Sequence, residues 1–375
     1  MQFRDLKKQY QVLKPTIDEA VMKVMTDCNF ISGQQVAALE ERLAKYVGVS
    51  YCVSCANGTD ALTLAMKVLG VKPGDAVFVP DFTFFSTGEV VSFEGATPVF
   101  VDVCKESYNM DPESLKTAIA AVKAEGKLKL KAVIPVDLFG RPYDADEINA
   151  IAHENGMTVV EDGAQGFGGS YKGRRACSLG DIATTSFFPA KPLGCYGDGG
   201  AVFTNSKEQY DLLKSLTVHG KGSFKYDNIR IGMNSRLDTI QAAVLDVKMN
   251  AFESSELDAV NNAAEWYDKY LAGKVFTPVH GGKYYSSWAQ YTIQLQSREQ
   301  RDSLQAYLKE KGIPTMVYYP KALHRQQAFD SIRKYIECPV TEVLTDCVLA
   351  LPMHPYMDEA MCREIASEII SFLSK

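Results

Sequence analysis

The sequence lacks the features that mark several large classes of protein. Its 375 residues contain no apolar run long enough to span a bilayer and no block of like charges, and 40 basic against 46 acidic residues give a net charge of −6. This balance argues against a nucleic-acid partner. The nine cysteines are scattered and odd in number, which favours free thiols in a reducing compartment. The charged segment Met1–Tyr10 has no apolar stretch of signal-peptide length, so we expect a cytoplasmic protein.

Sequence motifs for common nucleotide and metal sites are also missing. No G-x-G-x-x-G follows a predicted strand, and the nearest string, Gly166–Tyr171, ends in tyrosine. No G-x-x-x-x-G-K-[ST] occurs. The pair Cys52 and Cys55 has no second pair, and the five histidines show no ligand spacing. We therefore expect neither a Rossmann dehydrogenase, nor a P-loop protein, nor a metal site.

What is present from Tyr51 to Thr204 is an alternation of short apolar runs with segments of helical period. The runs are bounded by Gly, Pro or Asp, and helical patterns such as 59–69 and 145–155 lie between them. This alternation predicts an α/β fold with a mostly parallel sheet flanked by helices. The predicted strands are 51–54, 76–80, 98–101, 132–136, 158–161, 182–187 and 201–204.

The pattern of apolar and polar residues changes after Leu237. A long helical stretch, about 239–271, precedes a mixture of predicted strands and helices. These elements predict a smaller α+β domain, so we divide the chain into a large domain, 1–248, and a C-terminal domain, 249–375. The predicted elements of this second part are strands at 291–295 and 315–319 and helices at 300–311 and 357–373.

Polar residues that directly follow strands are candidate ligand-binding residues, because open α/β sheets bind ligands at the carboxyl ends of their strands. At Ser54–Asp60 a strand turns through Gly58 into a helix, and the helix N-terminus with the Thr59 hydroxyl would suit a phosphate. An ordinary helix cap is the alternative. At Pro80–Thr87, Phe84 could lie flat against a ring or pack in the core.

Two charged residues follow the later strands. Asp162 comes after an apolar strand, where it would either face a cation or cap a turn. Lys191 lies between Pro189 and Pro192, and burial there would lower the pKa of its ammonium and make it a nucleophile toward an aldehyde. A surface lysine is the alternative. A phosphate site, a carboxylate and a lysine together match what pyridoxal 5′-phosphate requires of a protein.

With these motifs in order, the chain resembles the DegT/DnrJ/EryC1/StrS family of pyridoxal-phosphate-dependent nucleotide-sugar aminotransferases. The resemblance implies the type I, aspartate-aminotransferase-like fold, with a large cofactor-binding domain and a smaller α+β C-terminal domain. It covers nearly the whole chain. The motifs that carry it are 30–33, 39–40, 57–62, 161–165, 186–191, 232–236, 319–320 and 351–355.

The resemblance implies roles for the residues around the cofactor ring. Lys191 would form the Schiff base and move the proton in both half-reactions. Asp162 would pair with the pyridine nitrogen, Gln165 would lie near the ring hydroxyl, and Phe84 would stack on the ring.

It also implies a phosphate cup and a shared site. Gly58, Thr59 and Ser186 would hold the phosphate, and Asn234 would complete the cup from the neighbouring subunit. We therefore expect a homodimer in which one chain alone is inactive.

The implied reaction is amino transfer from L-glutamate to a nucleotide-linked keto-sugar. The stretches 186–201, 229–230 and 234–238 look most like the enzymes that aminate UDP-2-acetamido-2-deoxy-3-oxo-D-glucuronate, for surface polysaccharide or lipopolysaccharide synthesis. A 3- or 4-keto-6-deoxy sugar on UDP or dTDP, or a non-catalytic regulatory homologue, is the alternative. The candidate substrate residues are Arg230, Arg236, Tyr319 and His324.

Overall fold

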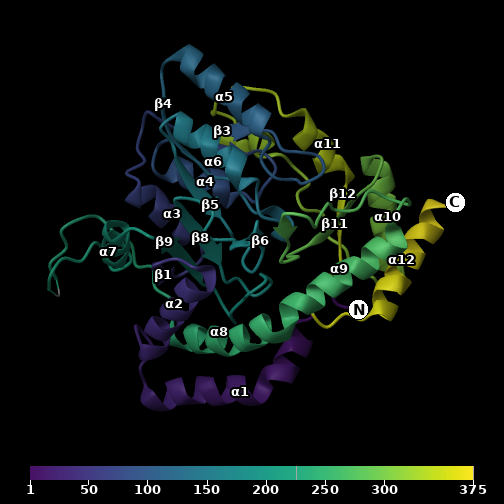
Figure 1. Ribbon diagram of the computed structural model, residues 1–375, viewed down its shortest axis with the longest axis horizontal. Coiled ribbons are helices and arrows are strands. Elements are labelled where there is room, and N and C mark those ends of the chain that lie inside the picture. The colour runs from purple at the N-terminus through teal and green to yellow at the C-terminus, as the bar shows by residue number, and fades with distance from the viewer. Residues whose placement is uncertain (225, 375) are drawn as a thin grey trace.

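A computed structural model describes residues 1–224 and 226–374 of the chain (Figure 1). Its centre is a seven-stranded sheet in the order β1-β9-β8-β5-β4-β2-β3. β9 runs antiparallel to both of its neighbours, and the other strands run parallel to one another, which confirms the predicted mostly parallel α/β fold. The strands are β1 (Tyr51–Cys55), β2 (Asp75–Pro80), β3 (Thr97–Val101), β4 (Lys129–Val133), β5 (Thr158–Asp162), β8 (Ile182–Ser186) and β9 (Gly200–Thr204).

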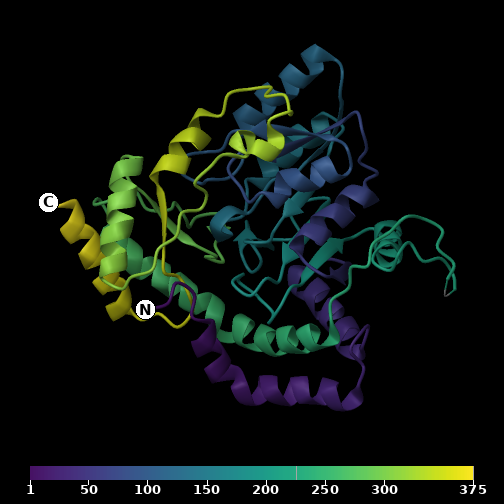
Figure 2. The same cartoon turned by 180° about the vertical axis from the view of Figure 1, so that it is seen from behind.

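Helices cover both faces of this sheet because its strands are apolar on both sides. On β2, Val77 and Val79 face one core and Ala76 and Phe78 face another. The first face is covered by α3 (Gly58–Val68), α4 (Ser86–Phe93) and α7 (Lys207–Leu216). The second is covered by α5 (Pro112–Glu125) and α6 (Ala145–Glu154) at one end and by α2 (Gln34–Val47) and α8 (Thr239–Ala251) at the other. α1 (Leu6–Asp27) runs along α8, as both ribbon views show (Figures 1 and 2).

A second hydrophobic core is built from the last third of the chain. It joins α9 (Leu257–Leu271), α10 (Arg298–Glu310) and α12 (Glu359–Leu373) to a two-stranded sheet of β11 (Tyr291–Gln294) and β12 (Val348–Leu351). A π-helical turn, Phe252–Glu256, connects α8 to α9. The domain boundary at residue 248 stays a prediction. The remaining elements are β6 (Ser170–Tyr171), β7 (Arg174–Arg175), β10 (Tyr284–Tyr285), α11 (Pro339–Cys347) and the 3-10 turns Leu138–Gly140, Leu323–Arg325 and Gln327–Phe329.

Two predicted strands need correction. The strand predicted at 132–136 begins earlier, at Lys129, and ends at Val133, because Pro135 has no N–H to donate to the ladder. The strand predicted at 315–319 is wrong. There only Met316 forms a bridge, to Ala350, and the segment that follows turns into a cleft of the large domain.

Two further features matter for the site. The segment between α7 and α8 extends away from the body of the molecule in both ribbon views (Figures 1 and 2). The N-terminal segment lies beside the C-terminal part, since the Met353 N–H donates to the Phe3 carbonyl at 3.2 Å.

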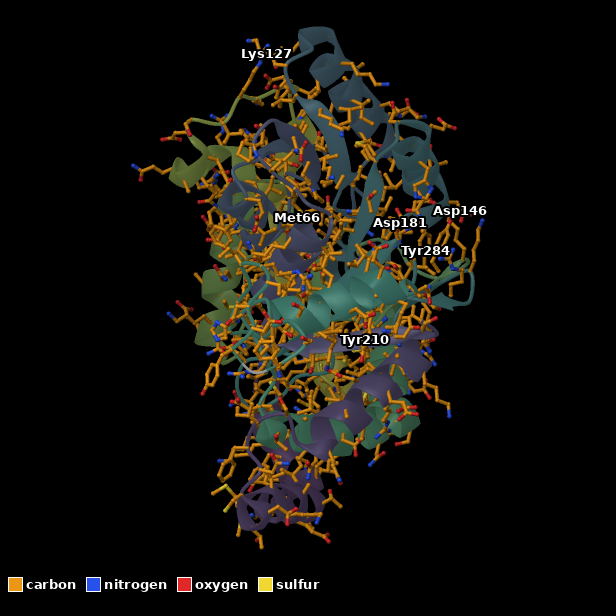
Figure 3. The ribbon with its side chains drawn as sticks, turned by 90° about the vertical axis from the view of Figure 1, so that its left-hand side faces the viewer. Met66, Lys127, Asp146, Asp181, Tyr210 and Tyr284 are labelled. Carbon is orange, nitrogen blue, oxygen red and sulfur yellow. The ribbon has the colours of Figure 1, made fainter. Side chains whose placement is uncertain are left out.

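Figure 3 shows Met66 of α3 inside the molecule and Lys127 projecting from it. Across the two described ranges, no helix is both long and apolar enough to cross a bilayer.

Candidate active site

A cleft opens at the carboxyl ends of β1, β2, β5 and β8. Its volume is about 1800 Å³, including the part open to solvent. Helices α3 and α4 and the loop that follows β8 form its walls, and residues 318–326 close its other side. The predicted site residues that line this one cleft are Gly58, Thr59, Phe84, Asp162, Gln165, Ser186, Lys191 and Tyr319.

Lys191 lies in the loop between β8 and β9. The loop is closed where the Cys195 N–H donates to the Phe187 carbonyl at 2.8 Å. Burial lowers the pKa of the Lys191 ammonium; the Asp162 carboxylate opposes this shift and the Arg4 guanidinium adds to it. Among the described residues, none forms a hydrogen bond or ion pair with Lys191 Nζ. A half-buried lysine amine of lowered pKa is suited to attack a carbonyl carbon.

Asp162 is the last residue of β5 and is 5% exposed. Its carboxylate accepts hydrogen bonds from the Ala164 N–H and the Thr87 hydroxyl, both at 3.2 Å. Burial raises the pKa of Asp162, while these two donors and the positive charge of Lys191 oppose the rise. A buried carboxylate in this setting is stabilised by a cation, such as a protonated ring nitrogen. Thr87 ends the stretch 80–87 noted in the sequence, but no motif assigns it a role.

A cradle for a phosphate lies where α3 begins. The Asn57 side chain caps the helix by accepting the Asp60 N–H at 2.8 Å. A Cβ on Gly58 would lie 2.6 Å from Ser186 Cβ, so only glycine lets the helix start approach the end of β8 this closely. The helix N-terminus and the hydroxyls of Thr59 and Ser186 therefore face the cleft together. This donor set fits the phosphate of pyridoxal 5′-phosphate.

Aromatic and amide groups form another part of the lining. Phe84 is 54% exposed and its ring centroid lies 6.4 Å from that of Tyr319. Gln165 Nε2 donates to the Tyr319 hydroxyl at 3.1 Å, and Gln165 Oε1 accepts the Phe139 N–H at 2.8 Å. Burial raises the pKa of Tyr319, so its hydroxyl stays protonated at neutral pH. The cleft thus presents one exposed ring and one polar edge to a planar ligand.

Three predicted residues lie outside this cleft, in the segment between α7 and α8. Arg236 Nη2 donates to Asn234 Oδ1 at 2.6 Å, and Arg230 Nη1 donates to Ser215 Oγ at 2.5 Å. None of the three is among the residues that line the cleft of their own chain.

His324 also points elsewhere. Its Nδ1 lies 2.6 Å from a carboxylate oxygen of Asp81, and its Nε2 lies 2.9 Å from Glu342 Oε1. The hydrogen bond to Asp81 is the first cause that raises the pKa of His324. The ring therefore ties the wall formed by residues 318–326 to the end of β2.

Comparisons with known proteins place this geometry in context. The model of the DegT/DnrJ/EryC1/StrS aminotransferase family matches residues 11–370. The UDP-2-acetamido-2-deoxy-3-oxo-D-glucuronate aminotransferase of Pseudomonas aeruginosa is 45% identical over 370 residues, which cover 98% of this chain and 99% of that one. The UDP-N-acetyl-3-dehydro-alpha-D-glucosamine 3-aminotransferase of Acidithiobacillus ferrooxidans is 39% identical over 97% and 96% of the two chains. A crystal structure of a DegT DnrJ EryC1 StrS aminotransferase from Brucella abortus superposes with a TM-score of 0.97 at 46% identity, covering both chains completely.

Proposed function

The chain belongs to the DegT/DnrJ/EryC1/StrS aminotransferase family, and from that premise we propose that it transfers the amino group of L-glutamate to C3 of UDP-2-acetamido-2-deoxy-3-oxo-D-glucuronate. The observation that carries the proposal is the meeting of Lys191, Asp162 and the Gly58 cradle in one cleft. The printed substrate of the 45% identical relative supports the choice of sugar.

Proteins of this family depend on pyridoxal 5′-phosphate, which supplies an aldehyde for the amino group and a ring that withdraws electrons. We assign the phosphate to Gly58, Thr59 and Ser186, and the ring nitrogen to Asp162. We further assign the ring hydroxyl to Gln165 and one face of the ring to Phe84.

We assign different chemical roles to Lys191 and Asp162. Burial lowers the pKa of Lys191 Nζ, which favours its base form. Lys191 Nζ would take a proton from the α-carbon of the amino donor in one half-reaction and deliver a proton to C3 of the sugar in the other. Asp162 would hold the ring nitrogen, and a protonated nitrogen there would favour the ionised form of this buried carboxyl.

We propose that the active enzyme is a homodimer with shared sites. The extended segment between α7 and α8 carries apolar side chains that a monomer leaves in water, since Phe224 is 64% exposed and Ile231 is 89% exposed. A second copy that covers this segment would receive Asn234 at its phosphate cup and Arg230 or Arg236 at its sugar-binding side. An arginine there suits the carboxylate or diphosphate of the substrate.

Tyr319 and His324 lie on the segment that closes the other side of the cleft, but only Tyr319 lines the cleft itself. We propose that Tyr319 contacts the sugar, because it lines the cleft directly. The charge on His324 would act on an anionic substrate only across Asp81 and Glu342, which already pair with it. The reaction would take place in the cytoplasm and supply an amino sugar for a surface polysaccharide.

The test is a reaction of the purified enzyme with ¹⁵N-labelled L-glutamate and the 3-oxo uronate nucleotide. We expect ¹⁵N at C3 of the product sugar, read by NMR, and no label with a dTDP-linked 4-keto-6-deoxy sugar. Faster labelling of the 6-deoxy sugar would refute the substrate assignment. No labelling of any keto-sugar by enzyme that contains the cofactor would favour a non-catalytic role.

A further inference from the structure

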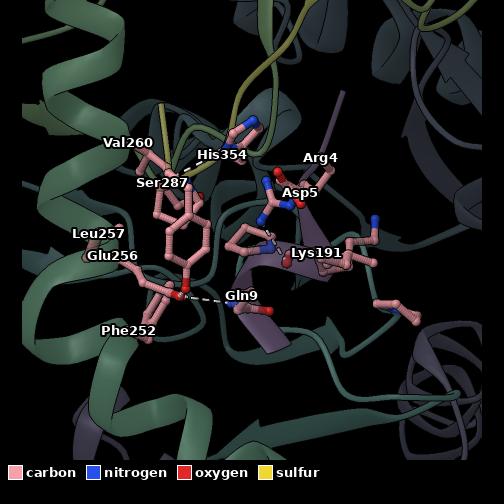
Figure 4. Close-up of a pocket in the computed structure, with 15 residues that line it drawn as sticks. Arg4, Asp5, Gln9, Lys191, Phe252, Glu256, Leu257, Val260, Ser287 and His354 are labelled. Carbon is pink, nitrogen blue, oxygen red and sulfur yellow. Dashed lines mark hydrogen bonds between the residues drawn. The ribbon is translucent and has the colours of Figure 1, made fainter. Parts of the chain in front are cut away.

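Two cations, the half-buried Arg4 and the buried Lys248, hold the backbone of the loop that carries Lys191. Arg4 Nη2 donates to the Lys191 carbonyl at 2.9 Å. The close-up in Figure 4 shows this bond together with the hydrogen bond between Gln9 and Glu256. Lys248 Nζ, on α8, donates to the Gly194 carbonyl. The Lys248 side chain is fully enclosed, and its ammonium lies 4.7 Å from the centroid of the Tyr196 ring. Both carbonyls lie within four consecutive residues of one loop.

These two charges are unfavourable where they lie. Burial lowers the pKa of Arg4 to about 10 and that of Lys248 to about 8. The Glu256 carboxylate opposes both shifts, and it also accepts hydrogen bonds from Gln9 Nε2 at 2.9 Å and from the Tyr356 hydroxyl at 2.5 Å. Two desolvated cations near one carboxylate add little stability by themselves, since apolar side chains of similar volume are often as stable.

The loop leaves little freedom for its carbonyls. A Cβ on Gly194 would lie 2.5 Å from the Pro189 carbonyl oxygen, so the turn is as tight as glycine allows. Cys195 N–H closes the turn on Phe187. When the carbonyls of Lys191 and Gly194 are held, the Cα of Lys191 is held too, and with it the point from which Nζ reaches into the cleft.

We propose that Arg4 and Lys248 are positioning residues for Lys191, which fix its backbone so that Nζ reaches the reacting carbon next to Asp162. The proposal rests on the assignment of Lys191 made above. Arg4 has a second effect, because its positive charge disfavours the protonated form of Lys191 while Asp162 favours it. A misplacement on the order of 1 Å at such a group costs about 100-fold in rate.

The test compares Arg4→Met and Lys248→Met with a matched control, Arg301→Met. Arg301 is an arginine that is more deeply buried than Arg4, at 4% exposed, and its Nη1 likewise donates to a backbone carbonyl, that of Thr345 at 3.3 Å, in the C-terminal core. Two quantities are measured for each variant. The first is the pKa of Lys191 in cofactor-free protein, from the pH dependence of trinitrobenzenesulfonate labelling mapped to the Lys191 peptide. The second is kcat and KM for the sugar nucleotide.

We expect Arg4→Met to raise the pKa of Lys191, because a nearby like charge is removed. We expect both loop variants to lower kcat by at least about tenfold with KM nearly unchanged, and Arg4→Lys to recover part of the loss. Arg301→Met should lower only the melting temperature. The proposal is overturned if the loop variants behave like Arg301→Met, with wild-type labelling and wild-type kcat. Because labelling uses cofactor-free protein, it reports on the loop even if Lys191→Ala shows that the assignment of Lys191 is wrong.

Discussion

Replacing Gly58 by alanine tests the phosphate cradle by adding a single methyl group. The new Cβ would lie 2.6 Å from Ser186 Cβ, 3.0 Å from Ser186 Oγ and 3.3 Å from Ser186 Cα. Since carbon atoms in contact prefer about 3.5–4.0 Å, the start of α3 must move about 1 Å away from the end of β8. Gly58 does not have a positive φ, so the effect is steric and not a matter of backbone strain.

Overpacking of this kind costs about 1–3 kcal/mol. This free-energy cost applies to the arrangement in which α3 and β8 lie close enough to hold the phosphate together. The apparent dissociation constant for pyridoxal 5′-phosphate should therefore rise about 5- to 150-fold. The assay is fluorescence titration of cofactor-free protein with the cofactor. Gly197→Ala is the matched control, because its Cβ would meet only the end of the flexible Gln241 side chain, at 3.0 Å. A Gly58→Ala protein that binds the cofactor as tightly as the Gly197→Ala protein would refute the placement of the phosphate.

Three further predictions follow from the same geometry. Asp162→Asn should leave the fold intact and lower kcat by at least about 100-fold, because the ring nitrogen loses its ionised partner; a rate within tenfold of wild type would contradict this role. Burial lowers the pKa of His354 to about 4. Between pH 6.5 and 4 the unfolded chain therefore binds a proton at this residue that the folded chain does not bind. The free energy of unfolding should fall by up to about 3 kcal/mol as the pH drops through that window. Urea unfolding of His354→Gln at pH 4.5 and 7 should show a flatter dependence, and an unchanged slope would exclude His354 as the cause. If sites are shared, Lys191→Ala and Asn234→Ala proteins, each inactive alone, should regain about a quarter of wild-type activity when they are refolded together. Half of the random dimers would then pair one chain of each kind, and each such dimer would hold one intact site of its two. No recovery of activity would argue for sites within one chain.

The sheet could be predicted because its strands are buried on both faces. Runs such as those of β2 and β9 are continuous in alanine, valine and phenylalanine, and each lies next to Gly or Pro. The segment 315–319 is rich in β-branched and aromatic residues, which also favour a strand, but it is not a strand. Its tyrosines serve the cleft instead, which no local pattern distinguishes from a ladder.

The candidate site could be predicted where a residue directly follows a strand. Asp162 and Gly58 are examples, because topology alone brings the carboxyl ends of parallel strands to one edge. Arg4 could not be predicted, since 187 residues separate it from the carbonyl it binds. The charge of His324 predicts a substrate residue. Its pairing with Asp81 could not be predicted, because the two residues lie 243 positions apart in the sequence.

The most direct test of the central claim is the absorption spectrum of the purified protein with pyridoxal 5′-phosphate, before and after addition of L-glutamate, compared with the Lys191→Ala protein. We predict a visible band in the wild-type protein that L-glutamate converts to an ultraviolet band, and a Lys191→Ala protein whose spectrum is that of cofactor not linked to the chain. A wild-type protein that stays colourless with added cofactor, or a Lys191→Ala protein with the wild-type spectrum and response, would contradict the account.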